Sequence, residues 1–150
     1  MRIRNYRPSD LQTLYQIDQV CFPPGIAYPK NELAAFIAMR GSRTWVAEAD
    51  GERIGFLIAC PESRSAVHIV TIDVVAANRR KGVGRALMDA AEQWASDQRT
   101  RVIYLETSED NLIAQRFYEA RGYRRVERID EYYSNGQAAW VMAKNLNDER

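Results

Sequence analysis

One stretch of the sequence, Val67–Ala95, constrains the fold more than any other. It reads VHIVTIDVV, then AANRRK, then GVGRALMDAAEQWA, which is the pattern of a buried strand, a basic loop and a helix that opens on Gly-Val-Gly. The first N–H groups of a helix have no partner within the helix, and the helix dipole favours negative charge there. Gly82 and Gly84 lack a Cβ atom, so an anion can approach the backbone closely. The stretch therefore predicts a phosphate-binding turn between a strand and a helix.

Four cations surround this turn, namely Arg79, Arg80, Lys81 and Arg85. A Gly-x-Gly pair alone also fits a plain turn at the start of a helix, but the flanking strand, helix and cations favour a bound phosphate. A P-loop is excluded because no GxxxxGK[ST] segment is present. A dinucleotide fingerprint needs a third glycine where Leu87 stands, although Glu106 lies at the distance expected for its acidic residue. The pyrophosphate loop of coenzyme A is the third interpretation, and it has no such conflict.

The composition indicates an ordinary soluble protein. The chain has 150 residues, 46% hydrophobic and 27% charged, which predicts one domain over residues 1–150 with a substantial core. A net charge of +1 argues against nucleic acid or a membrane as partner. Cys21 and Cys60 provide no disulfide framework, and His68 is the one histidine, so no metal site is expected. The opening MRIRNYRPSD has no apolar signal region, so we expect a cytoplasmic protein.

The apolar periodicity and turn residues predict eleven elements in the order β-α-α-β-β-β-α-β-α-β-β. In the first helix, Leu11, Leu14, Ile17 and Val20 fall on one face. A final hairpin, Tyr123–Tyr133 and Gln137–Leu146, is expected to turn at Asn135-Gly136, and Asn147–Arg150 reads as a loose tail. A meander followed by a β-α-β unit predicts an α/β (α+β) fold with a mixed sheet and helices on both faces.

The segment RRKGVG, residues 79–84, matches the (Arg/Gln)-x-x-Gly-x-(Gly/Ala) motif of the GCN5-related N-acetyltransferase (GNAT) superfamily. The segment NLIAQRFYE, residues 111–119, followed by Gly122-Tyr123, resembles the second motif of that superfamily, and the predicted element order is also the same. The resemblance implies a mostly antiparallel, seven-stranded mixed sheet. In it the fourth and fifth strands splay apart after a bulge, and acetyl-CoA lies between them.

A closer resemblance is to the N-terminal (α-amine) acetyltransferases of the bacterial ribosomal-protein-alanine type. It is carried by the segments Phe22-Pro23, Leu105-Glu106, Asn111, Tyr118, Tyr132–Gly136 and Trp140–Met142. It implies transfer of acetyl from acetyl-CoA to a protein or peptide N-terminal α-amine, by direct attack in a ternary complex. Lysine or small-molecule amines are alternative acceptors, and a non-catalytic acyl-CoA-binding module is an alternative of a different class. A monomer and a homodimer are both compatible.

The resemblance also implies which residues hold acetyl-CoA. The backbone of Ile72, Asp73 and Val74 would pair with the pantetheine arm, and an N–H near Val74 would hold the acetyl carbonyl. The pyrophosphate would lie on Arg79, Arg80, Lys81, Gly82, Val83, Gly84 and Arg85. Asn111 would hydrogen-bond the pantetheine. Because a charge is unusual within an apolar strand, we expect the Asp73 side chain to point to solvent at the bulge.

Three residues are candidates for proton transfer. Tyr118 would protonate the leaving CoA thiolate, although it also fits a core aromatic beside Phe117. Glu106 would accept the proton of the amine through a water molecule, or it could merely cap the helix that starts at Asp110/Asn111. His68 would share the base role, position water, or be structural.

The acceptor amine would lie against four further residues, Phe22, Pro23, Tyr28 and Tyr132, although ordinary packing would also account for them. An α-amine, with a pKa near 8, needs a weaker base than a lysine amine with a pKa near 10.4.

Overall fold

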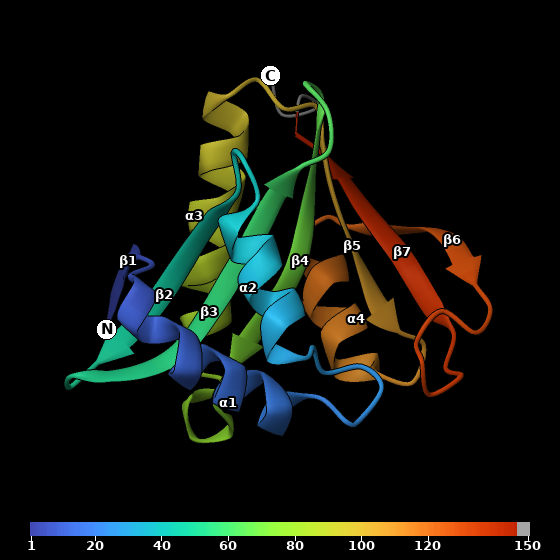
Figure 1. Cartoon of the computed structure of the whole chain (residues 1–150). Coiled ribbons are helices and arrows are strands. Elements are labelled where there is room, and N and C mark those ends of the chain that lie inside the picture. The colour runs from blue at the N-terminus through green and yellow to red at the C-terminus, as the bar shows by residue number, and fades with distance from the viewer. Residues whose placement is uncertain (147–150) are drawn as a thin grey trace.

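The computed structural model describes residues 1–146, which form a seven-stranded sheet flanked by helices (Figure 1). Along the chain the elements are β1 (Arg2–Asn5), the 3₁₀ turn η1 (Pro8–Asp10), α1 (Leu11–Cys21), α2 (Lys30–Ala38), β2 (Arg43–Ala49), β3 (Glu52–Pro61), β4 (Ala66–Val74), the 3₁₀ turn η2 (Ala76–Asn78), α3 (Val83–Asp97), β5 (Val102–Ser108), α4 (Leu112–Ala120), β6 (Arg124–Ile129) and β7 (Ala139–Asn145). The predicted order of helices and strands is confirmed. Asn147–Arg150, expected as a loose tail, lies outside the described residues. None of the helices in residues 1–146 has the length and apolarity that crossing a membrane requires.

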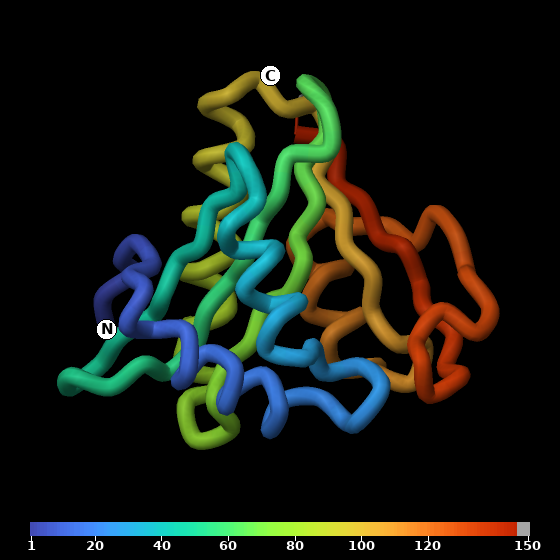
Figure 2. The backbone as a smooth tube through the Cα atoms, in the orientation of Figure 1, coloured from blue at the N-terminus to red at the C-terminus, as the bar shows by residue number. Residues whose placement is uncertain are grey.

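The sheet has the strand order β1-β2-β3-β4-β5-β7-β6, and β4 and β5 are its parallel pair among antiparallel neighbours. These two strands pair only between Ala66–His68 and Val102–Tyr104. Just beyond, β4 bulges: Ile58 and Ala59 of β3 face Thr71 and Ile69, which leaves one extra residue, Val70, in β4. From this point β4 and β5 diverge (Figure 2). The mixed sheet and the splay after a bulge are as predicted.

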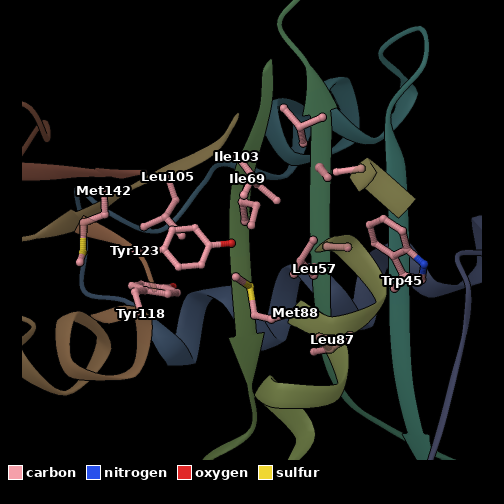
Figure 3. Packing of buried hydrophobic residues seen from close by; sticks show 14 of the residues in the cluster. Trp45, Leu57, Ile69, Leu87, Met88, Ile103, Leu105, Tyr118, Tyr123 and Met142 are labelled. Atoms are coloured by element: carbon pink, nitrogen blue, oxygen red, sulfur yellow. The ribbon is translucent and has the colours of Figure 1, made fainter. Parts of the chain in front are cut away.

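Each face of the sheet carries its own core. On the face covered by α1 and α2, Leu14 and Leu33 pack against Phe56 of β3. On the face covered by α3 and α4, Met88 and Tyr118 belong to a second cluster of buried apolar side chains (Figure 3). The helices thus cover both faces of the sheet, as expected from the sequence (Figure 1).

The face of α1 that packs against the sheet differs from the face that the sequence predicts. Leu14 and Ile17 are buried as expected, but Val20 is 83% exposed, and Asp18 is fully buried instead. The buried face follows the i, i+3, i+4 spacing through residues 14, 17 and 18, so it includes a carboxylate that a hydrophobic pattern assigns to the outside.

The predicted final hairpin is shorter than expected. β6 ends at Ile129 and β7 starts at Ala139, so residues 130–138 form a loop. Asn135-Gly136 does turn the chain, since the Tyr133 N–H donates to the Gln137 carbonyl at 3.1 Å. The strands stop short of it because the loop contacts another part of the chain: the Ser134 hydroxyl donates to the Gly25 carbonyl at 3.0 Å.

A buried carboxylate, Asp10, joins the N-terminal segment to the sheet. Its side chain is fully buried and accepts hydrogen bonds from the Arg4 guanidinium (2.9 Å), from Arg53 Nε (2.6 Å) and from the Arg7 N–H (2.7 Å). Burial opposes ionisation of Asp10, but the hydrogen bonds from Arg4 and Arg53 outweigh it and hold the pKa of this carboxyl well below its ordinary value. Arg4 is itself buried, so the two charges depend on each other.

We expect Asp10→Asn to lower the free energy of unfolding by about 3 kcal/mol at pH 7, because the buried Arg4 loses one of its two carboxylate partners and keeps only the partly exposed Glu48. A carboxyl whose pKa is lowered by folding stabilises above its ordinary pKa, and this stabilisation is lost as the pH falls. The difference in the free energy of unfolding between wild type and Asp10→Asn therefore becomes smaller below about pH 4. Urea unfolding at pH 7 and pH 3 measures it, with the exposed Asp97→Asn as control. An equal difference in the free energy of unfolding at both pH values would contradict the ion pair between Asp10 and Arg4.

Candidate active site

A cavity of about 330 Å³ opens where β4 and β5 diverge. Its walls come from these two strands, from α4, and from two loops, one after α1 and the other between β6 and β7. Eight of the residues predicted from the sequence line it: Phe22, Pro23, Tyr28, Ile72, Glu106, Asn111, Tyr118 and Tyr132. The structure therefore brings the predicted acceptor residues and two of the three proton-transfer candidates into one space.

Glu106 and His68 form a hydrogen-bonded pair across the two strands. His68 Nε2 lies 2.6 Å from Glu106 Oε1, and the side chains are 15% and 14% exposed. The His68 ring stacks on Tyr104, its partner in the last paired rung of β4 and β5, with the ring centroids 4.8 Å apart. On the other edge of the ring, Nδ1 lies 4.0 Å from a Glu62 carboxylate oxygen. The third candidate, His68, thus reaches the cavity through Glu106.

Two tyrosines flank Glu106 at the wall of the cavity. Tyr132 lies beside Glu106, and burial together with the Glu106 carboxylate raises the pKa of Tyr132 to about 12. The Tyr28 hydroxyl donates to the Val70 carbonyl at the bulge, at 3.4 Å, and its backbone N–H donates to Asp18 at 2.7 Å. These contacts fix the loop after α1 against β4.

Asn111 is the N-cap of α4. Its side-chain oxygen accepts a hydrogen bond from the Ala114 N–H at 3.1 Å, which satisfies one of the free donors at the start of the helix. The alternative role for Glu106, as the cap of this helix, is therefore wrong. Glu106 instead directs its carboxylate to His68 and Tyr132.

Tyr118 packs as a core aromatic, as one of the two interpretations from the sequence predicted, and its role as the acid stays a prediction. It is 8% exposed and packs edge-on against Phe117, with ring centroids 5.5 Å apart. It also packs edge-on against Tyr123, at 5.9 Å (Figure 3). It also lines the cavity. Burial, and secondarily the charge of Asp73, raise the pKa of Tyr118 well above its ordinary value. The phenol is therefore protonated at neutral pH.

The glycine-rich turn, residues 79–85, lies outside this cavity, where the chain enters α3. Arg80 and Gly82 adopt left-handed backbone conformations, with φ of 62° and 83°, and the first helical bond runs from the Ala86 N–H to the Gly82 carbonyl. A Cβ on Gly82 would meet no atom within 4 Å, whereas one on Gly84 would lie 3.4 Å from the Phe117 ring. Gly82 thus faces open space, and Gly84 allows α3 to pack against α4.

The cations of this turn do not all point the same way. Arg79 folds back, and its Nε donates to the Val74 carbonyl at 3.0 Å. Arg80, Lys81 and Arg85 lie in the turn and the first turn of α3, while the Val83 side chain is buried in the core.

The expectation for Asp73 is wrong. Its side chain is 1% exposed and accepts a hydrogen bond from the Thr71 hydroxyl at 2.5 Å. The prediction assumed that a charge in an apolar strand must reach water. The bulge instead turns Asp73 toward α1, where Asp18 is also buried.

The sequence did not lead us to several residues that lie near Glu106 and His68 or line the same cavity. Tyr104 stacks on His68 and lies near Glu62, while Tyr133 and Gln137 line the cavity. Tyr104 could have been found, since it precedes Glu106 by two residues and side chains two apart in a strand share a face. Glu62 lies in the connection between strands, and no pattern marks it.

Comparison with known proteins agrees with this geometry. A family model described as Acetyltransferase (GNAT) family matches residues 11–123. The chain belongs to this family. An N-alpha-acetyltransferase of Sulfurisphaera tokodaii is 28% identical to it, with 97% of this chain and 93% of the relative covered. The structure of Ard1 from Thermoplasma volcanium superposes with a TM-score of 0.87 at 27% identity, covering 96% of each chain.

The ribosomal-protein-S18-alanine N-acetyltransferase from Escherichia coli has the same fold, with a TM-score of 0.84 at 23% identity over 97% of this chain and 93% of that one. As a GNAT acetyltransferase, the protein is an enzyme that uses acetyl-CoA. The non-catalytic binding module considered from the sequence is therefore excluded.

The residues of this GNAT acetyltransferase fit acetyl-CoA at two places. Beyond His68, β4 has no strand partner on its β5 side within residues 1–146, so its backbone groups are available to an extended ligand. The start of α3 offers unpaired N–H groups beside a glycine that faces open space. The extended pantetheine arm of CoA would fit the free edge of β4, and its phosphates would fit the start of α3.

We expect Gly82→Val to weaken CoA binding at least tenfold, because its side chain would occupy the space in front of the α3 N-terminus. Isothermal titration with CoA measures the dissociation constant. Gly51→Val is the matched control, since Gly51 also has a left-handed backbone (φ 77°) and open space around it, but lies in the β2–β3 turn. Both variants share the backbone strain of about 1–2 kcal/mol. Equal affinities for CoA in the two variants would contradict the phosphate site.

Proposed function

We propose that this GNAT enzyme acetylates the α-amine of protein or peptide N-termini. The observation that carries the proposal is the way in which the two acceptor loops meet over the cavity. The Ser134 hydroxyl donates to the Gly25 carbonyl at 3.0 Å, and the Asn135 side-chain amide lies 3.5 Å from the Pro24 carbonyl. A Cβ on Gly25 would lie 2.7 Å from the Asn135 Cβ, so the loops touch without room for another atom.

A cavity bridged in this way favours a chain terminus over the middle of a chain. Tyr28, Tyr132 and Phe22 would then contact the first residue of the acceptor, while its amine points to Glu106. The relatives named N-alpha-acetyltransferase support the same acceptor.

Glu106 is the base in this proposal. A primary amine must lose a proton before or as it attacks, and an α-amine with a pKa near 8 needs only a modest base. Glu106 would take this proton directly or through a water molecule. With its Nε2 protonated, His68 donates to Glu106, and Tyr132 lies beside the same carboxylate. Both neighbours hold the carboxylate in place against the amine.

Tyr118 is the acid. Acetyl-CoA supplies the acetyl thioester, and its thiol must leave as a neutral group or a thiolate. Tyr118 stays protonated because burial raises its pKa, and it lines the same cavity as Glu106. It would donate its proton to the departing sulfur.

The remaining predicted contacts concern acetyl-CoA. The backbone of Ile72, Asp73 and Val74 would hold the pantetheine arm, with Asn111 beside it, and the N–H groups at the start of α3 would hold the pyrophosphate. An N–H near Val74 would stabilise negative charge on the acetyl oxygen.

Mass spectrometry of the products tests the acceptor class. The enzyme is given acetyl-CoA with three acceptors: peptides with free N-termini and no lysine, N-terminally blocked peptides that contain lysine, and small amines such as aminoglycosides. We expect acetyl groups on the α-amines at a rate at least tenfold above the other two. Preferential modification of lysine or of the small amines would overturn the proposal.

We expect Tyr118→Phe to lower kcat about 100-fold or more while CoA binding is retained, because the phenyl ring keeps the packing but cannot donate a proton. Steady-state kinetics with titration calorimetry separates the two effects. Tyr123→Phe is the control: Tyr123 packs on Tyr118, but its hydroxyl bonds Glu92 at 2.8 Å. An unchanged kcat in Tyr118→Phe would remove it from the acid role.

A further inference from the structure

Two carboxyl groups, Asp18 of α1 and Asp73 of β4, are buried together behind the acceptor wall, with exposed fractions of 0% and 1%. One oxygen of each has a donor. Asp18 Oδ2 accepts from the Tyr28 N–H at 2.7 Å, and Asp73 Oδ1 accepts from the Thr71 hydroxyl at 2.5 Å. The pair is therefore anchored at one end to the acceptor loop and at the other to β4.

The other two oxygens have no donor. Asp18 Oδ1 and Asp73 Oδ2 are buried and lack hydrogen-bond partners within the described part of the chain, and the Asp18 side chain lies within hydrogen-bonding reach of Asp73. Two ionised carboxylates at this range repel each other, and two buried unsatisfied acceptors add a further cost. A single proton between them turns one oxygen into a donor and removes both problems.

Within residues 1–146, the neighbouring side chains do not supply a hydrogen-bond donor to these two carboxylate oxygens. Arg79 attracts Asp73, but its Nε is bound to the Val74 carbonyl, and its Nη2 lies 3.7 Å from Cys21 Sγ. The pKa of Cys21 is raised by burial and by the charge of Asp73, while Tyr118 and Tyr28 are uncharged phenols that face Asp73 and Asp18. Burial and the neighbouring Asp18 raise the pKa of Asp73 well above its ordinary value, which agrees with the unpaired buried oxygens in favouring Asp73 as the carrier of the proton.

We propose that Asp18 and Asp73 share one proton, and that this carboxyl–carboxylate pair positions the acceptor loop on β4. Both are positioning residues: they act through Tyr28, whose N–H binds Asp18 and whose hydroxyl binds Val70 at the bulge. The effect on the acceptor rests on the proposed function, whereas the shared proton does not.

Infrared spectroscopy tests the shared proton directly. A protonated carboxyl has a carbonyl stretch separate from the bands of carboxylates. We expect this band in the wild type at pH 7 and its loss in Asp73→Asn, whose amide can still donate to Asp18 and accept from Thr71. Absence of the band in the wild type, or its persistence in Asp73→Asn, would overturn the proposal.

Thermal unfolding tests it independently. A carboxyl whose pKa is raised by folding makes the protein lose stability as the pH rises from the ordinary value of 3.8 toward the raised one. Asp73→Asn does not titrate, so we expect its Tm relative to wild type to increase with pH and to exceed wild type by a few degrees at pH 8. A difference in Tm that is independent of pH would contradict the shared proton.

Kinetics tests the positioning role. Asp18→Ala removes the acceptor for the Tyr28 N–H, so we expect the KM for the amine acceptor to rise about tenfold, with a smaller change in the KM for acetyl-CoA. Asp18→Asn keeps an oxygen for Tyr28 and a donor for Asp73, and should restore most of the acceptor KM. An Asp18→Asn variant as impaired as Asp18→Ala would overturn the positioning role. If the infrared band is present but no α-amine is acetylated, the proposed function fails and the shared proton stands.

Discussion

The pairing of β4 with β5 stops after three residues on each strand, and the other features of the site depend on where it stops. Backbone N–H and carbonyl groups that leave a sheet need new partners. Some on β4 find side chains: the Val70 carbonyl accepts from Tyr28, and the Val74 carbonyl accepts from Arg79. Those that face the gap are left for a ligand. The same divergence thus opens the cavity and provides the edge on which acetyl-CoA can be held.

The walls of the cavity join segments that are far apart in the sequence. The loop after α1 meets the loop between β6 and β7 through Ser134 and Gly25. On the opposite side, the contact of Gly84 with Phe117 brings the start of α3 against the helix that carries Tyr118. The glycine-rich turn and Tyr118 are therefore connected through a contact between two helices, and the two loops that line the cavity are connected through a contact between loops.

The sequence was sufficient for the parts of the structure that follow local rules. The element order, the glycine turn and several residues that line the cavity were predicted because periodicity, glycine positions and family motifs record them directly. Val20 was wrongly placed on the buried face of the first helix because a hydrophobic pattern passes over carboxylates, whereas Asp18 is the residue buried there, beside Asp73. Residues 130–133 and 137–138 were predicted as strand, because the contact of this loop with Gly25 is a tertiary interaction that no local pattern records. The hydrogen bond between His68 and Glu106 depends on strand register, which the sequence did not specify.

The bulge at Val70 changes which residues of β4, odd-numbered or even-numbered, face each side of the sheet. Before it, odd-numbered residues face the α3 and α4 core, as Val67 and Ile69 do; after it, even-numbered Ile72 and Val74 pack there. The bulge is what sends Asp73 to the α1 side and Ile72 to the other. In a strand of the same sequence that kept strict alternation through Val70, Asp73 would be buried among the apolar side chains of the α3 and α4 core, and Ile72 would turn toward Asp18. The bulge thus decides which face of the sheet carries charge.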